Sequence, residues 1–215
     1  MNARRGWLTR MSHTIPRLYA ILDSACFSEP ARLFNAGEDL VACGVTLLQY
    51  REKTGKARQM LERARGLRLR LSNRAKLIMN DRADLALAAG CDGVHVGQDD
   101  LSPAGARCVL GERLWVGVST HSVEQVRGAD ASPADYIAVG PVFATATKQD
   151  PEPVIGVEGV RAARAATRKP LVAIGGITRK NCRSVIEAGA DAVAVISDLI
   201  REPRKSAEEF FRILG

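Results

Sequence analysis

A loop rich in hydrogen-bond donors follows a short apolar run in the second half of the chain. The run, Tyr136–Val139, suits a strand buried on both faces, and it ends at a Gly-Pro pair that cannot continue a strand ladder. Thr145, Thr147 and Lys148 then supply two hydroxyls and an ammonium. Donors of these kinds, held together at a strand end, suit a phosphate or a diphosphate. A solvated loop of the same composition is the alternative, and the loop alone does not decide between them.

Two carboxylates occupy equivalent places after two other apolar runs. Asp81 follows the run Lys76–Met79, and Asp100 follows the run Gly93–Val96. Two carboxylates, together with substrate phosphate oxygens and waters, are the usual ligands of Mg²⁺ in proteins. Each Asp would alternatively cap the helix that follows it, which is common for this residue type. The cationic side chains near both positions favour the metal site.

These candidate residues follow apolar runs that alternate with helical patterns along most of the chain. The eight runs are Leu18–Leu22, Val45–Tyr50, Lys76–Met79, Gly93–Val96, Leu114–Val118, Tyr136–Val139, Leu171–Ile174 and Ala192–Ile196. Strict alternation of buried strands with helices indicates a parallel sheet, and eight such units close into a barrel. The sequence therefore predicts an α/β fold, a single (β/α)8 TIM barrel over residues 17–215 with a short N-terminal extension, residues 1–16. A doubly wound open sheet is the alternative, but the first β-α turn lacks a Gly-rich dinucleotide fingerprint.

A barrel of this kind gathers its active site at the C-terminal ends of the strands. Polar residues and glycines fall at those ends in this sequence. They are Gln49, Arg51, Lys53, Asn80, Asp81, Gln98, Asp100, Ser119, His121, Thr145, Thr147, Lys148, Gly175, Gly176 and Ser197. Gly175 and Gly176 precede one helix and Ser197 precedes a short helical turn, which matches the phosphate site common after strands seven and eight. The set predicts a site for phosphorylated substrates and Mg²⁺.

The composition indicates a soluble globular protein with an anionic partner. Of the 215 residues, 46% are apolar and 26% are charged, and the formal net charge is +7. No apolar run approaches the ~20 residues that span a bilayer, and the basic N-terminus lacks the apolar segment of a secretory signal. The five cysteines are scattered and odd in number, as expected for thiols of a reducing compartment. We therefore expect a cytoplasmic protein without a membrane partner.

Nucleic acid and small phosphorylated substrates both fit the positive charge. The longest predicted helix, Lys56–Arg74, carries arginines along one face. That face has no interleaved aromatic residues for base stacking. A solvated outer face of an amphipathic helix explains it better. The interpretation therefore favours small-molecule substrates and no nucleic-acid partner.

Seven motifs stand at the predicted strand ends. They are Gln-Tyr-Arg-Glu-Lys (Gln49–Lys53), Asn-Asp-Arg (Asn80–Arg82), Gly-Val-His-Val-Gly-Gln-Asp-Asp-Leu (Gly93–Leu101), Gly-Val-Ser-Thr-His (Gly117–His121), Gly-Pro-Val-Phe-Ala-Thr-Ala-Thr-Lys (Gly140–Lys148), Val-Ala-Ile-Gly-Gly-Ile (Val172–Ile177) and Val-Ile-Ser (Val195–Ser197). One motif alone is weak, but the ordered set resembles the thiamine phosphate synthase (thiamine-phosphate pyrophosphorylase) family over about Leu18–Leu199. The family more often has Pro where Ala144 stands here, and the leader before Arg17 has no counterpart.

The resemblance implies a reaction. The family condenses 4-amino-2-methyl-5-(diphosphooxymethyl)pyrimidine with 4-methyl-5-(2-phosphoethyl)thiazole, or its carboxylated form. The products are thiamine phosphate and diphosphate. The family's chemistry is dissociative: diphosphate leaves first, and the thiazole nitrogen captures the resulting pyrimidine methylene cation. The resemblance thus implies a Mg²⁺-dependent transferase of thiamine biosynthesis, whose protein groups stabilise charge on the leaving diphosphate and hold two reactants in line.

The resemblance also implies roles for individual residues. It assigns the diphosphate to Arg51, Lys53, Asn80 and Lys148, of which Arg51, Lys53 and Lys148 are the expected catalytic groups. It assigns Mg²⁺ to Asp81 and Asp100, and the pyrimidine to Gln49 and Ser119. It assigns the thiazole and its phosphate to Thr145, Thr147, Gly176, Ile196 and Ser197. The motif positions also expected to bind substrate are Tyr50, Glu52, Ala146 and Gly175. His95 and His121 are interpreted as structural, and Asp23 has no assigned role.

Two other functions remain as alternatives. The related thiazole tautomerase is an isomerase on a similar barrel that needs no metal, and the complete Mg²⁺ and Thr-x-Thr-Lys sets count against it. A nucleic-acid-binding or regulatory role rests only on the net charge and the arginine-rich helix. Salt-sensitive retention on heparin without thiamine phosphate formation would support that role. The sequence leaves open whether the chain forms a homo-oligomer.

Overall fold

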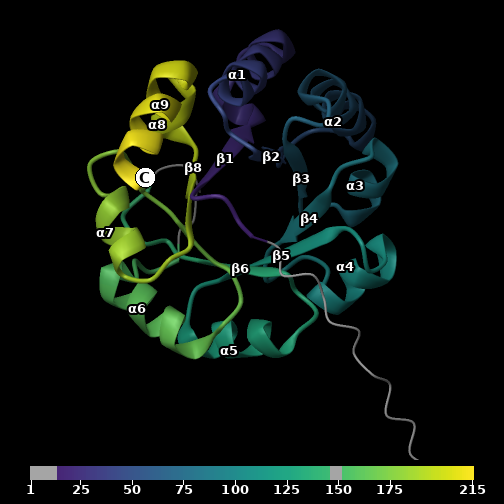
Figure 1. Ribbon diagram of the computed structural model, residues 1–215. Helices are drawn as coiled ribbons and strands as arrows, with labels where there is room; N and C mark the ends of the chain where they lie inside the picture. Colours follow the sequence, from purple (N-terminus) through teal and green to yellow (C-terminus); the bar gives the residue numbers. More distant parts are fainter. Residues whose placement is uncertain (1–13, 146–151) are drawn as a thin grey trace, which may run out of the picture.

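Eight parallel strands hydrogen-bond in chain order and close into a barrel when β8 pairs with β1 (Figure 1). The computed structural model describes residues 14–145 and 152–215. The strands are β1 (Leu18–Asp23), β2 (Leu47–Arg51), β3 (Lys76–Asn80), β4 (Gly93–Val96), β5 (Trp115–Thr120), β6 (Tyr136–Val139), β7 (Leu171–Ile174) and β8 (Ala192–Val195). The predicted (β/α)8 barrel is confirmed. Residues 1–13 of the predicted extension lie outside the described residues.

Helices surround the barrel on the outside, one or two after each strand (Figure 1). They are the short 3-10 helix η1 (Ser24–Cys26), α1 (Pro30–Ala42), α2 (Ala57–Leu71), α3 (Ala83–Ala89), α4 (Pro103–Leu110), α5 (Val123–Ala131), α6 (Gly156–Ala166), α7 (Cys182–Glu187), α8 (Ser197–Ile200) and α9 (Pro203–Leu214). The predicted strand and helix ends shift by a few residues at most. The shift that matters is in β5, which runs on to Thr120, so that Ser119 lies on the strand itself.

The apolar residues form two separate cores, because successive side chains of a strand point to opposite faces. One core lies inside the barrel and includes Tyr19, Trp115 and Tyr136. The other lies between the barrel and the helices, and Leu48 and Tyr50 of β2 belong to it. The period of two along each strand therefore decides which residues reach the interior and the site above it.

Three aspartates at the N-terminal end of the barrel share one arrangement. Asp92, just before β4, accepts hydrogen bonds from the backbone N–H of Leu77 and from Arg68. Asp135 and Asp191, just before β6 and β8, do the same with the backbone N–H groups of Val116 in β5 and Leu171 in β7, and their arginines come from α4 and α6. Each aspartate thus joins the start of one strand to a helix on the outside. The same arrangement recurs at β3 and α2, at β5 and α4, and at β7 and α6.

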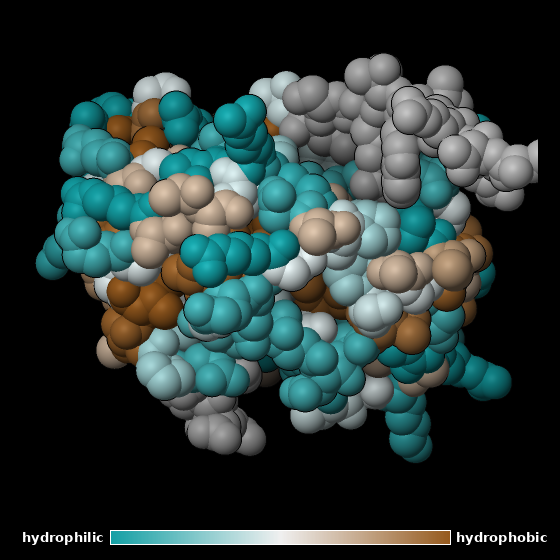
Figure 2. All heavy atoms as spheres, turned by 90° about the horizontal axis from the view of Figure 1, so that it is seen from below, coloured by the Kyte–Doolittle hydropathy of each residue, from teal (hydrophilic) through white to brown (hydrophobic). Residues whose placement is uncertain are grey.

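Figure 2 shows one side of the molecule, where hydrophilic residues run across the middle and apolar residues gather in smaller areas beside them. In the part of the chain that the structure describes, no helix has the length and apolar character needed to cross a membrane.

The aspartate repeat leads to a stability prediction. Asp135 and Arg107 are 6% and 7% exposed, so Asp135→Ala would leave a buried guanidinium without its carboxylate. We expect the free energy of unfolding in urea to fall by about 3–5 kcal/mol. Asp191→Ala is the matched control, because its pair with Arg164 is 46% and 27% exposed and water can replace the lost contact. Equal losses in the two variants would contradict the idea that burial decides the strength of these pairs.

Candidate active site

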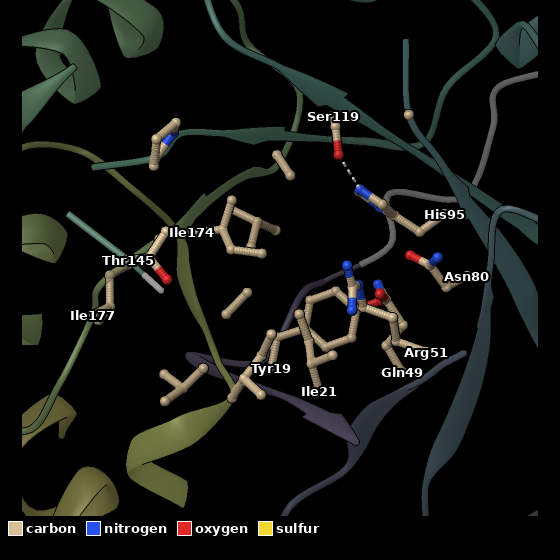
Figure 3. Close-up of a pocket in the computed structure, with 18 of the residues that line it drawn as sticks. Tyr19, Ile21, Gln49, Arg51, Asn80, His95, Ser119, Thr145, Ile174 and Ile177 are labelled. Atoms are coloured by element: carbon tan, nitrogen blue, oxygen red, sulfur yellow. Dashed lines mark hydrogen bonds between the residues drawn. The ribbon is translucent and has the colours of Figure 1, made fainter. Parts of the chain in front are cut away.

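The C-terminal strand ends enclose a cavity of about 330 Å³ (Figure 3). Gln49, Arg51, Asn80 and His95 lie on one side of this cavity, and Thr145, Ile174 and Ile177 lie on the other. The residues predicted to form a site that line it are Gln49, Arg51, Lys53, Asn80, Asp81, Asp100, Ser119, Thr145, Gly175, Gly176, Ile196 and Ser197. The structure therefore brings together predicted residues from seven strand ends. Ala146, Thr147 and Lys148 lie outside the described residues.

Tyr50 and Glu52, both expected to bind substrate, do not line the cavity. Tyr50 points away from the barrel interior because it alternates with Gln49 and Arg51 along β2, and Glu52, the residue after the strand, continues the alternation. The Glu52 carboxylate instead accepts a hydrogen bond from Arg63 of α2 at 2.5 Å. Both residues thus support the outer layer.

The two cationic residues of β2 and its loop each meet a carboxylate. Arg51 forms an ion pair with Asp23, which is 2% exposed and lies beside it in the register of β1 and β2. Lys53 Nζ lies 2.5 Å from Asp81 Oδ2. Asp23, without an assigned role from sequence, therefore orients the guanidinium toward the cavity. Its place at a strand end was the signal that the sequence offered.

Asp81 and Asp100 both line the cavity wall. Burial raises the pKa of Asp81; the hydrogen bond from Lys53 opposes this shift, and the neighbouring Asp100 carboxyl adds to it. Asp100 Oδ2 also accepts from the backbone N–H of Gly97 at 2.8 Å, which fixes its position. Asp81 has a φ of 63°, in the left-handed region that non-glycine residues seldom adopt. Such strain persists only where the surroundings hold it, and it often occurs at functional sites.

The acid pair fits a hard divalent cation. Two carboxylates in contact repel one another unless a proton or a cation lies between them. Among residues 14–145 and 152–215, no cluster of three or more His, Cys, Asp or Glu side chains is placed to hold a metal. A pair of carboxylates completed by substrate phosphates and water is what Mg²⁺ prefers, whereas zinc usually takes at least three protein ligands. The donor set therefore suits Mg²⁺ bound together with a phosphorylated substrate.

Asn80 offers a donor next to this pair. Its amide nitrogen Nδ2 is buried and has no hydrogen-bond partner in the described structure. A buried donor without a partner costs about 1–3 kcal/mol unless a ligand satisfies it. Since Asn80 lines the cavity, a phosphate oxygen is a suitable acceptor.

Two glycines shape the opposite wall. Gly175 and Gly176, directly after β7, have φ values of 101° and 62°. A Cβ atom on Gly176 would lie 2.5 Å from the carbonyl oxygen of Ala144 and 2.8 Å from Cβ of Phe143. The loops after β6 and β7 therefore approach closely only because glycine stands here. Thr145 lines the cavity directly beyond this contact.

Both histidines predicted to be structural have hydrogen-bond partners. His95 contacts Tyr136 through Nδ1 and Ser119 through Nε2, at 3.0 and 2.9 Å. His121 Nδ1 contacts the carbonyl oxygen of Gly140 and so links the ends of β5 and β6. Both also line the cavity. No local pattern in the sequence indicates the hydrogen bonds of His95, because its partners come from other strands of the barrel.

Known proteins resemble this chain in sequence and in fold. Residues 18–199 match the protein family described as thiamine monophosphate synthase. A thiamine-phosphate synthase of Koribacter versatilis (strain Ellin345) is 59% identical over 203 residues, which cover 93% of this chain and 96% of that protein. One from Chloroflexus aurantiacus is 46% identical over 186 residues, covering 86% and 85%. The solved structure of thiamine phosphate pyrophosphorylase from Pyrococcus furiosus superimposes with a TM-score of 0.82 at 33% identity, covering 92% of this chain and 95% of that one.

His95 makes a prediction about pH. Burial lowers its pKa from 6.5 to about 4, so the folded protein keeps the ring neutral where the unfolded chain takes up a proton. The stability that this provides is complete above pH 6.5 and is lost as the pH falls toward 4. We expect the loss to be about 3 kcal/mol. Urea unfolding of wild type and His95→Gln at pH 7 and pH 4.5 measures it: the variant should lose less stability than wild type, and equal losses would contradict this origin.

Proposed function

The chain belongs to the thiamine monophosphate synthase family, and from this premise we propose that its acid pair holds Mg²⁺ while its cations bind a leaving diphosphate. The enzyme condenses 4-amino-2-methyl-5-(diphosphooxymethyl)pyrimidine with the thiazole phosphate to give thiamine phosphate and diphosphate. The observation that carries the proposal is that Asp81, ion-paired with Lys53, lines the same cavity wall as Asp100. Two acids so placed favour a divalent cation, and this cation and the nearby basic side chains favour a diphosphate.

The diphosphate group is proposed to lie against the ends of β2 and β3. Arg51 and Lys53 face this part of the cavity with positive charge, and Asn80 supplies an amide donor without a protein partner. Asp23 holds the guanidinium of Arg51 in place. Lys148 is proposed to add a further charge from the loop after β6. These groups stabilise the negative charge that develops as the C–O bond breaks, and they need no reorganisation to do so.

Mg²⁺ is proposed to bind Asp81 and Asp100. When bound there, it would neutralise diphosphate charge and so assist departure of this group. The Gly97 amide and the unusual backbone at Asp81 hold the two carboxylates in place before any ion arrives.

The second substrate is proposed to lie on the opposite wall, against the loops after β6, β7 and β8. Gly176, Ser197, Ile196 and Thr145 line that wall, with Ile196 proposed to lie beside the aromatic part of the thiazole. Thr147 is proposed as a further donor. Gln49 and Ser119 are proposed to hold the pyrimidine between the two phosphate sites. The chain then holds the thiazole nitrogen close to the pyrimidine methylene, and this alignment favours capture of the cation over its reaction with water.

The proposed location is the cytoplasm. All five cysteines are free thiols, which agrees with a reducing compartment.

A substitution at Asp100 tests the proposed metal site. Asp100→Asn keeps the shape of the side chain but removes one charge, so the pair would bind Mg²⁺ poorly. We expect kcat to fall on the order of 10²–10³-fold, the usual effect of losing one preorganised charge-stabilising group. Asp84→Asn, on the exposed first turn of α3, is the control and should leave turnover unchanged. Full Mg²⁺-dependent turnover in Asp100→Asn would show that the assignment is wrong.

A substitution at Gly176 tests the proposed thiazole phosphate site. An added methyl would push against Ala144 and displace the loop that carries Thr145. We expect Gly176→Ala to raise the KM of the thiazole phosphate roughly tenfold, or about 1.4 kcal/mol, with little change for the pyrimidine diphosphate. Gly90→Ala has a similar φ of 68° but no atom within 4 Å of the new methyl, so it measures backbone strain alone. Equal KM changes for both substrates would indicate general damage instead.

A further inference from the structure

Five side chains form a continuous hydrogen-bonded chain at and below the floor of the cavity. The amide nitrogen of Gln49 donates to Tyr19, whose hydroxyl lies 3.0 Å from that of Tyr136. Tyr136 contacts Nδ1 of His95 at 3.0 Å, and Nε2 of His95 contacts the hydroxyl of Ser119 at 2.9 Å. We call these five residues the buried polar chain. It joins Gln49 to Ser119, the two residues proposed to hold the pyrimidine.

The barrel makes room for the middle of this chain at Gly117. In the strand register Gly117 of β5 lies between His95 of β4 and Tyr136 of β6. A Cβ atom there would lie 2.1 Å from Cζ of Tyr136 and 2.5 Å from Nδ1 of His95. The two rings meet over the glycine with their centroids 5.4 Å apart. An apolar interior would need none of these polar groups, so their burial calls for a role beyond packing.

One direction of donation satisfies all four contacts of the buried polar chain. The Gln49 amide nitrogen donates to the Tyr19 oxygen; in this direction Tyr19 donates to Tyr136, and Tyr136 donates to Nδ1 of His95. A neutral imidazole with Nδ1 as acceptor carries its hydrogen on Nε2, and this hydrogen is donated to the oxygen of Ser119.

Every ring in the chain stays neutral near pH 7. Burial lowers the pKa of His95 to about 4, and burial raises the pKa of Tyr19 and of Tyr136 well above the ordinary value. The chain therefore carries fixed donors and acceptors and no net charge. Its two ends are the carbonyl oxygen of the Gln49 amide and the hydroxyl hydrogen of Ser119, and neither has a hydrogen-bond partner within residues 14–145 and 152–215.

We propose that Tyr19, Tyr136 and His95 are positioning residues that fix which way Gln49 and Ser119 present their hydrogen-bonding atoms to the pyrimidine. The inference rests on the assignment of Gln49 and Ser119 under Proposed function. With the chain directed as above, Gln49 offers an acceptor to the exocyclic amine of the substrate, and Ser119 offers a donor to an acceptor atom of the same molecule. A 4-oxo pyrimidine would set its carbonyl oxygen against the Gln49 oxygen, so the chain selects the 4-amino compound.

Substitutions that remove one hydroxyl and keep the ring test this role. In Tyr19→Phe the Gln49 amide loses its hydrogen-bond partner and is free to rotate by about 180°. In Tyr136→Phe, Nδ1 of His95 loses the hydroxyl that donates to it. We expect each to raise the KM of the pyrimidine diphosphate roughly tenfold and leave the KM of the thiazole phosphate unchanged. In Tyr19→Phe, the ratio of kcat/KM for the amino substrate to that for its 4-oxo analogue should fall at least about tenfold. An unchanged ratio, or equal KM increases for both substrates, would overturn the proposal.

Two replacements of His95 separate positioning from packing. The amide nitrogen of Gln in His95→Gln falls near the place of Nε2 and keeps a donor for Ser119. In His95→Asn, the amide oxygen can take the place of Nδ1 as the acceptor for Tyr136, and Ser119 loses its donor. We expect His95→Gln to retain the lower pyrimidine KM of the two. A lower pyrimidine KM in His95→Asn than in His95→Gln would overturn the inference. A pyrimidine KM that only rises as the melting temperature of the variant falls would indicate a packing role and overturn it as well.

A spectroscopic measurement needs no substrate and tests the direction itself. Ring ¹⁵N spectra of the wild-type protein should show His95 with its hydrogen on Nε2, and Tyr136→Phe should weaken this preference; the His95→Gln spectrum identifies the signals. A hydrogen on Nδ1 would overturn the proposed direction.

Gln49→Ala distinguishes failure of the pyrimidine site from failure of the positioning role. An unchanged KM of the pyrimidine diphosphate in this variant overturns the pyrimidine site together with the inference. A KM raised in Gln49→Ala but unchanged in Tyr19→Phe overturns the positioning role alone.

Discussion

Closure of a parallel barrel brings the carboxyl ends of all strands to one rim, and the chemistry of this protein depends on that constraint. Residues from distant parts of the sequence meet there without any long loop to carry them. The same closure leaves little room inside, so each inward position must hold a side chain that fits its neighbours. Gly117 shows this limit: without a side chain it lets His95 and Tyr136 meet across it. The aspartates at the opposite end join strands to helices and leave the rim to function.

At the rim, electrostatics decides the arrangement. Asp23 fixes Arg51 through an ion pair away from the acid pair, so the guanidinium faces the cavity with a defined orientation. Lys53 lies against Asp81, and Asp100 lines the same wall, which places two acids beside one cation. Such a site is preorganised for a substrate that brings negative charge and for an ion that brings positive charge. A protein that bound a neutral ligand would gain nothing from this arrangement.

The sequence predicted the barrel because eight apolar runs alternate with helical patterns, and it predicted the rim residues because polar motifs follow those runs. The alternation along β2 also contained the signal that Tyr50 and Glu52 point outward, since they lie one residue away from Gln49 and Arg51. The ion pair of Arg51 with Asp23 and the buried polar chain were not predictable from local patterns. They depend on the register between strands and on side chains that meet across the barrel, such as Tyr19 with Tyr136, which are 117 residues apart in sequence.

The central claim is that the acid pair serves the reaction by holding a divalent cation together with the diphosphate. The most direct measurement is thiamine phosphate formation by the wild-type protein, supplied with both substrates after treatment with a chelator and then after addition of Mg²⁺. The account predicts almost no product before Mg²⁺ is added and full turnover afterwards. Undiminished turnover in excess chelator would contradict it.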